Sequence, residues 1–280
     1  MKRIITYLLI VLCGNACAQK ISSSVSAQSV ALTDSFKLLT LLPGSYTNME
    51  VDGVGNLYLL TSGNQLKKFS SQGDSVAVFN DVRRFGNVSY IDVSNPLRPL
   101  VYYKNFSTVV LLDRLLTVRT TLNLRKVQIF RVNAITTSYD NNLWIFDEQD
   151  FKLKKITEEG RVLLESIDPR LSADKTPSPL FIADTENFIY LYDPIIGLIV
   201  FDQYTAYKNT IPLTGWNALS VSNNRIFGLK GNTIIMYDPE KKDTRSFTLP
   251  SGFSNASAIR AAGNKVYVLD KEGVRTYLIP

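Results

Sequence analysis

A strand pattern that recurs six times along the chain predicts an all-β fold, a six-bladed β-propeller. The pattern is clearest from Val51 to Ser70, where a turn rich in Gly and Asn precedes a short apolar strand and a second turn follows. Related stretches return at a spacing of about 40 residues, which is the period of propeller blades. No segment sustains a helical period, so an array of helices is excluded.

Each unit is recognised by its second strand, which follows an Asn in five units and a Pro in the other. The six copies are N-L-Y-L-L (56–60), P-L-V-Y-Y (99–103), N-L-W-I-F (142–146), N-F-I-Y-L-Y (187–192), N-R-I-F-G-L (224–229) and N-K-V-Y-V-L (264–269). A β-sandwich also has many short strands, but it gives no reason for this pattern to recur at a regular spacing.

The strand count predicts how the ring closes. The first five units each contain four strands, whereas the sixth ends at Pro280 after three. An additional strand at Phe36 to Leu41 precedes the first unit and can pair with Val274 to Leu278. This pairing leaves no sheet without a neighbour, so we expect a ring closed by the N-terminal strand and a propeller of residues 36–280.

The N-terminus has the three regions of a secretory signal peptide. Lys2 and Arg3 are positive, an apolar run of ten residues extends from Ile4 to Cys13, and Ala16-Cys17-Ala18 fits a cleavage site. Such a run is too short for a hydrocarbon core that needs about 20 residues. We therefore expect residues 1–18 to be removed and no transmembrane segment to remain, the alternative being an uncleaved apolar segment.

Both cysteines, Cys13 and Cys17, lie in this signal, so the mature chain is expected to contain none. Residues 19–35, rich in Ser and Ala, predict a short exposed lead-in. Export places the protein in the periplasm or at the outer membrane. Lipidation of Cys17 is an alternative, although the Leu usual three residues before such a cysteine is absent.

Charge argues against a nucleic-acid partner. The formal net charge is only +6, and two of those charges belong to the signal. Arginines gather around the predicted strand 116–124, which alternates apolar and polar residues. This strand fits either an outer strand with solvated arginines or an anionic docking patch, so the candidate partner-binding residues are Arg114, Arg119 and Arg125.

The first unit also resembles a known repeat. Its sequence V-D-G-V-G-N-L-Y-L-L-T-S-G-N-Q-L-K-K-F-S-S-Q-G (51–73) resembles the NHL repeat, whose blades carry an Asp-x-x-Gly-Asn-hydrophobic-Tyr hairpin. Weaker similarity extends over 187–202 and 264–277. Related six-bladed rings include the gluconolactonase-like and peptidyl-glycine-lyase propellers. The resemblance implies the fold and carries no activity.

The catalytic members of those groups use metal sites. The chain contains no histidine, which excludes imidazole-bound zinc or iron, Ser-His-Asp catalysis and a histidine base. A calcium site of the lactonase type needs only oxygen ligands. Four predicted first strands end near an aspartate: Asp52, Asp92, Asp140 and Asp184. They fit either a calcium-binding set or turn residues that cap backbone N–H groups, and the second interpretation is favoured.

One further constellation is common to most units. Where the chain enters the first strand, an Asn stands beside or just after an aromatic residue, and in a propeller these points surround one mouth of the central channel. The candidate ligand-binding residues are Tyr46, Asn48, Phe85, Asn87, Asn133, Trp216, Asn217, Phe253 and Asn255. Amides and rings at one opening suit a glycan, peptide or carbonyl ligand. Alternatively, each Asn satisfies its turn and each ring packs between blades.

The sequence therefore favours an exported, non-catalytic binding or scaffold propeller of the bacterial cell envelope that recognises a protein or glycan partner without a cofactor. One alternative is a calcium-dependent lactonase- or lyase-like enzyme. Another is a structural subunit of an envelope assembly, docked through the arginine-rich strand.

Overall fold

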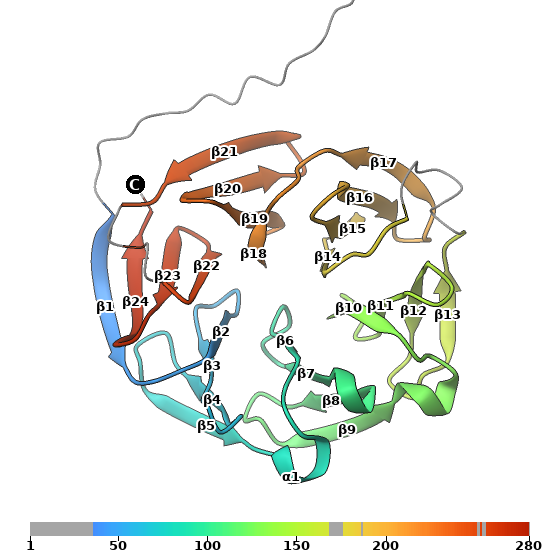
Figure 1. The fold of residues 1–280 in the computed structure, drawn as a ribbon, viewed down its shortest axis with the longest axis horizontal. Helices are drawn as coiled ribbons and strands as arrows, with labels where there is room; N and C mark the ends of the chain where they lie inside the picture. The colour runs from blue at the N-terminus through green and yellow to red at the C-terminus, as the bar shows by residue number, and fades with distance from the viewer. Residues whose placement is uncertain (1–35, 168–175, 186, 251–252, 254–255, 280) are drawn as a thin grey trace, which may run out of the picture.

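The computed structural model describes residues 36–167, 176–185, 187–250, 253 and 256–279. The predicted signal segment 1–18 with Cys17, the lead-in 19–35 and Asn255 lie outside the described residues. Six four-stranded antiparallel sheets surround a central axis (Figure 1), so the predicted six-bladed β-propeller is confirmed. The described residues include no helix with the length and hydropathy needed to cross a membrane.

The first three blades follow the chain in order, each from its innermost to its outermost strand. The first contains β2 (Asn48–Val51), β3 (Leu57–Leu60), β4 (Leu66–Phe69) and β5 (Ser75–Phe79). The second contains β6 (Tyr90–Asp92), β7 (Leu100–Tyr103), β8 (Thr108–Leu112) and β9 (Val118–Asn123). The third contains β10 (Val132–Thr137), β11 (Leu143–Asp147), β12 (Lys152–Ile156) and β13 (Val162–Glu165).

The other blades repeat this order until the ring closes. The fourth contains β14 (Phe181–Asp184), β15 (Phe188–Asp193), β16 (Gly197–Asp202) and β17 (Tyr207–Ile211). The fifth contains β18 (Asn217–Ser222), β19 (Arg225–Lys230), β20 (Thr233–Asp238) and β21 (Asp243–Thr248). The sixth contains β22 (Ala258–Ala262), β23 (Lys265–Leu269), β24 (Gly273–Leu278) and, outermost, β1 (Lys37–Pro43).

Ring closure depends on β1, as the strand count predicted. Its residues pair antiparallel with β24 from Lys37 opposite Leu278 to Pro43 opposite Gly273. Leu42 of β1 also packs against the buried cluster between the sixth and first blades. The beginning of the propeller is thereby joined to its end by backbone hydrogen bonds and by apolar contact.

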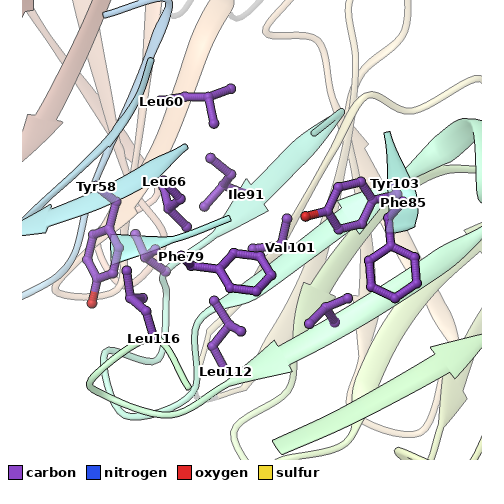
Figure 2. Close-up of a cluster of buried hydrophobic side chains, with 12 residues drawn as sticks. Tyr58, Leu60, Leu66, Phe79, Phe85, Ile91, Val101, Tyr103, Leu112 and Leu116 are labelled. Atoms are coloured by element: carbon purple, nitrogen blue, oxygen red, sulfur yellow. The ribbon is translucent and has the colours of Figure 1, made fainter. Parts of the chain in front are cut away.

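The core consists of six apolar clusters, one between each pair of neighbouring blades. Figure 2 shows the cluster between the first and second blades, where Tyr58 and Phe79 face Ile91 and Val101. Every cluster receives at least one buried aromatic side chain from the second strand of the preceding blade: Tyr58, Tyr102, Trp144, Tyr190, Phe227 and Tyr267. The aromatic residue of the repeat therefore serves to pack one blade on the next.

The buried aromatic residues do not stand at a constant distance from the Asn on which the repeats were aligned. In the first and third blades the aromatic side chain lies two residues after the Asn, whereas in the last three blades it lies three residues after it. Side chains alternate between the two faces of a strand, so a shift of one residue would turn the ring away from the next blade. Burial of the aromatic residue sets the register of the second strand, and the length of the turn before that strand differs by one residue between blades.

Short helical turns connect strands in the second blade and at its two ends: α1 (Val82–Phe85), η1 (Lys104–Phe106) and η2 (Leu124–Val127). The last of them shortens the arginine-rich strand, because η2 begins at Leu124. Leu116 is buried in the preceding turn with a positive φ of 60° and does not belong to the strand. The predicted alternation over 116–124 is thus limited to β9.

Candidate functional site

A depression of about 870 Å³ lies at the mouth of the central channel. It is on the face where the innermost strands begin, and its lining comes from the fifth and sixth blades and from the start of the first. Its lining includes Asn48, Asn217, Asn232, Phe253, Ser257 and Arg260. Three predicted ligand-binding residues, Asn48, Asn217 and Phe253, are therefore brought together here.

The amide groups of the depression differ in their availability. Asn217, the exposed first residue of β18, makes no side-chain hydrogen bond to any described residue. The Oδ1 of Asn48 accepts the backbone N–H of Met49 at 2.8 Å, which leaves its NH₂ group available. Asn232 instead donates its side chain to the carbonyl oxygen of Leu249, an acceptor at the end of the fifth blade. Two amides can thus bond to a ligand, and the third maintains the wall.

Arg260, which lines the depression, is part of an ion pair. Arg260 of β22 donates from Nε and Nη2 to the two carboxylate oxygens of Glu50 of β2, at 2.9 and 2.6 Å. Burial would lower the pKa of Arg260, but the charge and hydrogen bonds of Glu50 outweigh it and raise the pKa above the ordinary value. The charge of the guanidinium is therefore already compensated by Glu50, so Arg260 makes the lining polar but is not a free cation for an anionic ligand.

Tyr90 of β6 lies near this pair. Burial raises the pKa of its hydroxyl well above the ordinary value, and the neighbouring carboxylates of Asp92 and Glu50 add to that effect, while the charge of Arg260 opposes it. The phenol consequently remains neutral and can only donate or share a hydrogen bond at physiological pH.

Most of the predicted rings are used for packing. Phe85 is buried against Tyr103 with ring centroids 5.2 Å apart (Figure 2), and Trp216 is buried in a stack on Tyr192 at 6.0 Å. Tyr46 contacts Phe69 edge to face, and burial raises the pKa of its hydroxyl. Phe253 is also buried, with its ring 4.6 Å from that of Tyr277. Little surface of Phe85, Trp216 or Phe253 is therefore left for a ligand, and their contacts fit the alternative in which the predicted rings pack in the core.

The remaining described amides hold neighbouring blades together. Asn87 accepts a hydrogen bond from the side chain of Asn64 at 3.1 Å. Asn133 accepts one from Lys104 at 2.6 Å and donates to the carbonyl oxygen of Pro179 at 3.4 Å. Neither residue lines the depression, because each lies on the opposite side of the ring from its centre.

The three candidate arginines do not form one patch. Arg114 is in the turn before β9, Arg119 lies on the strand, and Arg125 follows it in η2. All three side chains are largely exposed, but only Arg125 is fixed by side-chain hydrogen bonds, to Ser107 and Asn105. The group therefore extends along the whole outer edge of the second blade.

Three of the four aspartates, Asp52, Asp92 and Asp140, accept backbone N–H groups of their own turns. One carboxylate oxygen of Asp52 accepts the backbone N–H groups of Val54 and Asn56 at 3.0 and 2.9 Å. Asp140 accepts the N–H of Asn142 at 3.3 Å and forms an ion pair with Lys155 at 2.7 Å. These contacts confirm the interpretation of both residues as turn formers.

Asp92, in addition to its turn contact, and Asp184, which has no such contact among the described residues, reach into the third blade. Asp92 accepts the hydroxyl of Thr136 and the N–H of Thr137, while Asp184 accepts the indole N–H of Trp144 at 2.9 Å. Their oxygens are thus occupied by donors of a neighbouring blade. Among the described residues, no group of three His, Cys, Asp or Glu side chains is arranged to hold a metal ion.

Sequence reasoning missed Glu50, Arg260 and Lys104. A signal existed for the first two, because opposite charges stand in the middle of the short inner strands N-M-E-V and A-I-R-A-A. A charge at such a position calls for a partner across the channel. Lys104 carried no comparable signal, since it stands in a turn where a lysine is ordinary.

The comparisons with known proteins agree with this architecture. A streptogramin B lyase matches with a TM-score of 0.56 at 14% identity, over 88% of this chain and 86% of that one. The chain is a six-bladed β-propeller similar in structure to these lyases. A catalytically inactive virginiamycin B lyase of Staphylococcus aureus, with a histidine replaced by alanine and quinupristin present, matches with a TM-score of 0.55 at 14% identity, over 87% of each chain.

PorZ of Porphyromonas gingivalis, an essential bacterial surface component of the type-IX secretion system, matches with a TM-score of 0.51 at 15% identity. That match covers 87% of this chain and 38% of PorZ. No protein-family model matches the sequence, and no curated protein matches it. Similarity at these identities concerns the fold alone, which lyases and surface proteins share.

Proposed function

We propose that this protein is an exported, non-catalytic binding propeller of the bacterial cell envelope, which recognises a protein or glycan partner at the mouth of its channel. The single observation that carries the proposal is the depression of about 870 Å³ lined by Asn48, Asn217 and Phe253. Its volume lies within the range of ligand sites, and it combines amide groups with apolar surface. Amides both donate and accept hydrogen bonds, as peptide groups and sugar hydroxyls require.

Two properties of the chain argue for binding without catalysis. The structurally similar virginiamycin B lyase is inactive when one histidine is replaced by alanine, and the present chain contains no histidine. In addition, Arg260 is the one charged side chain among the described lining residues, and it is already paired with Glu50. The signal-like N-terminus supports export, and the surface protein PorZ is an example of this fold in a bacterial envelope.

Binding arrays test the proposal. Labelled protein is applied to glycan and peptide arrays, and the best ligand is titrated against the double variant Asn48→Ala/Asn217→Ala. Loss of two hydrogen-bonding amides is expected to weaken binding roughly tenfold or more. The matched control is Asn64→Ala/Asn87→Ala, which removes two amides from the same face outside the depression and leaves affinity unchanged.

Unchanged affinity in the folded double variant would show that the depression is not the site. An absence of any ligand on both arrays would contradict the proposal as a whole. Fractionation of cells that express the full chain, with detection in the periplasm or outer membrane, tests the envelope location separately.

A further inference from the structure

A second cavity, of about 360 Å³, lies between the second and third blades. It is formed where η1, η2 and the chain entering β10 meet, so it opens on the same face as the depression but on other blades. Its lining includes the basic side chains Lys104, Arg125 and Arg131, with Phe130 and Glu148 beside them. Two of the three bases follow β9 in sequence, and Lys104 comes from the turn after β7.

Two of these cations are held in place by neutral acceptors. Arg125 donates from Nε to the hydroxyl of Ser107 at 3.1 Å and from Nη2 to the carbonyl oxygen of Asn105 at 3.2 Å. The Nζ of Lys104 donates to the amide oxygen of Asn133 at 2.6 Å. Such bonds orient a positive group without cancelling its charge, so both retain their attraction for an anion.

Three basic side chains elsewhere in the fold are neutralised by carboxylates, whereas the buried Lys68, like Lys104, donates to a neutral acceptor, the carbonyl oxygen of Arg114. Lys154 is paired with Asp147 and Asp150, Lys155 with Asp140, and Arg260 with Glu50. In those places a carboxylate both orients the cation and neutralises it. The cavity between the second and third blades thus concentrates positive charge that the protein itself does not compensate.

Among the described residues, one carboxylate lines the cavity. Glu148 accepts the hydroxyl of Ser178 at 3.0 Å, and its other oxygen is 4.0 Å from Nη2 of Arg131. It faces three bases, and Arg131 is 71% exposed and able to move toward a ligand. Tyr102 adds no charge, because burial raises the pKa of its hydroxyl to about 12, Glu148 adds to this effect and Arg125 opposes it. The described residues of the lining therefore carry an excess of two positive charges.

An exposed ring borders the charged groups. Phe130 lines the cavity, and its side chain is 49% exposed although phenylalanine is normally buried. Aromatic rings offer a flat apolar surface on which the C–H face of a sugar can pack. Fixed cations beside such a ring are complementary to a molecule that carries an oxyanion on a sugar ring.

We propose that this cavity binds an acidic saccharide, with the carboxylate, sulfate or phosphate group received by Lys104, Arg125 and Arg131 and the sugar ring packed on Phe130. The site is separate from the depression, so it goes beyond the proposed function and stands without it. The shared chemistry is an oxyanion on a sugar, and the choice among the three anionic groups is left to the titration.

Isothermal titration calorimetry of the full chain tests the proposal. The probes are trigalacturonic acid for the carboxylate and a heparin-derived tetrasaccharide for the sulfate, glucose 6-phosphate for the phosphate, maltotriose as the neutral control and inorganic phosphate as the free anion. At least one acidic saccharide is expected to bind more tightly than both maltotriose and inorganic phosphate. Binding should weaken when the salt concentration is raised to 0.5 M. The distance over which exposed charges interact falls from about 10 Å at 0.1 M salt toward about 3 Å at 1 M.

The variants Lys104→Gln and Arg125→Gln are each expected to weaken this binding roughly tenfold. Lys126→Gln is the matched control, because it removes one charge from the same turn as Arg125 but lines a different cavity. Phe130→Ala should weaken the saccharide and leave inorganic phosphate unaffected. If Arg125→Gln fails to fold, Lys104→Gln decides the question, since its side chain bonds only to Asn133.

Equal affinity of the wild type and Lys104→Gln for the acidic saccharides would overturn the proposal, as would an equal loss in Lys126→Gln. Inorganic phosphate binding as tightly as every saccharide would also overturn it, because the ring would then contribute nothing. The Asn48→Ala/Asn217→Ala variant should bind the acidic saccharide like the wild type, which separates this site from the depression.

Discussion

Gly228 leaves room for the buried ring of Trp216, the residue before Asn217. It lies in β19, directly against the indole ring of Trp216, and a Cβ atom built on it would overlap that ring. Trp216 in turn stacks on Tyr192, whose hydroxyl donates to the carbonyl oxygen of Trp216 at 3.1 Å. The absence of one methyl group thus allows the ring to be buried and places the amide of Asn217 at the depression.

Gly228→Ala is therefore expected to lower the free energy of unfolding by about 1–3 kcal/mol, because the ring or the backbone must shift. Urea unfolding measures this loss. Gly53→Ala is the control, since no atom lies within 4 Å of a Cβ there and φ is not positive. A Gly228→Ala protein as stable as the wild type would contradict the packing described here.

The strand β1 has a different role from the other outer strands, because it comes from the opposite end of the chain. It supplies the fourth strand of the sixth blade, and Leu42 covers the cluster around Met49 and Val274. Its remaining leucines, Leu38, Leu39 and Leu41, are exposed and contribute little to the core. Closure therefore depends on the backbone pairing of β1, on Leu42 and on Phe36 just before the strand, which packs on Phe253.

Deletion of residues 1–43 is expected to lower the melting temperature by at least 10 °C, because the pairing of β1 contributes several kcal/mol to stability. In a chain of this size, each kcal/mol lost lowers the melting temperature by about 2–4 °C. The exposed edge of β24 should also promote association. Calorimetry and light scattering measure both effects. Leu38→Ser, an exposed position, should leave the melting temperature within about 2 °C.

A peptide with the sequence of residues 36–44, added to the truncated protein, should restore part of the lost stability by replacing the strand. A truncated protein that melts like the full chain would show that β1 does not hold the ring closed.

The ring is also joined near its axis. Glu50 and Arg260 are separated by 210 positions in the sequence, yet their side chains form a two-point ion pair between the first and sixth blades. Their side chains are 16% and 12% exposed, so the pair is largely removed from solvent. The first and last blades are therefore linked twice, at the rim by β1 and at the channel by this pair.

Arg260→Leu is expected to lower the free energy of unfolding by about 3 kcal/mol, because the largely buried carboxylate of Glu50 loses its partner. The double variant Glu50→Leu/Arg260→Leu should recover most of this loss, since no unpaired charge remains. Guanidinium unfolding of the wild type, both single variants and the double variant completes the cycle. Additive losses in the double variant would mean that the two residues are not coupled.

The number of blades, the strand that closes them and the aspartate turns could be predicted from the sequence, because repeats, strand periods and turn residues are local properties that each unit carries in full. The register of the last three blades and the fate of Phe85 and Trp216 could not, since burial between blades decides which face of a strand a side chain occupies. The same holds for the two cavities. Asn48 meets Asn217, and Lys104 meets Arg125, only after the ring has closed and neighbouring turns have been packed together, so only the tertiary structure determines which side chains can share a ligand.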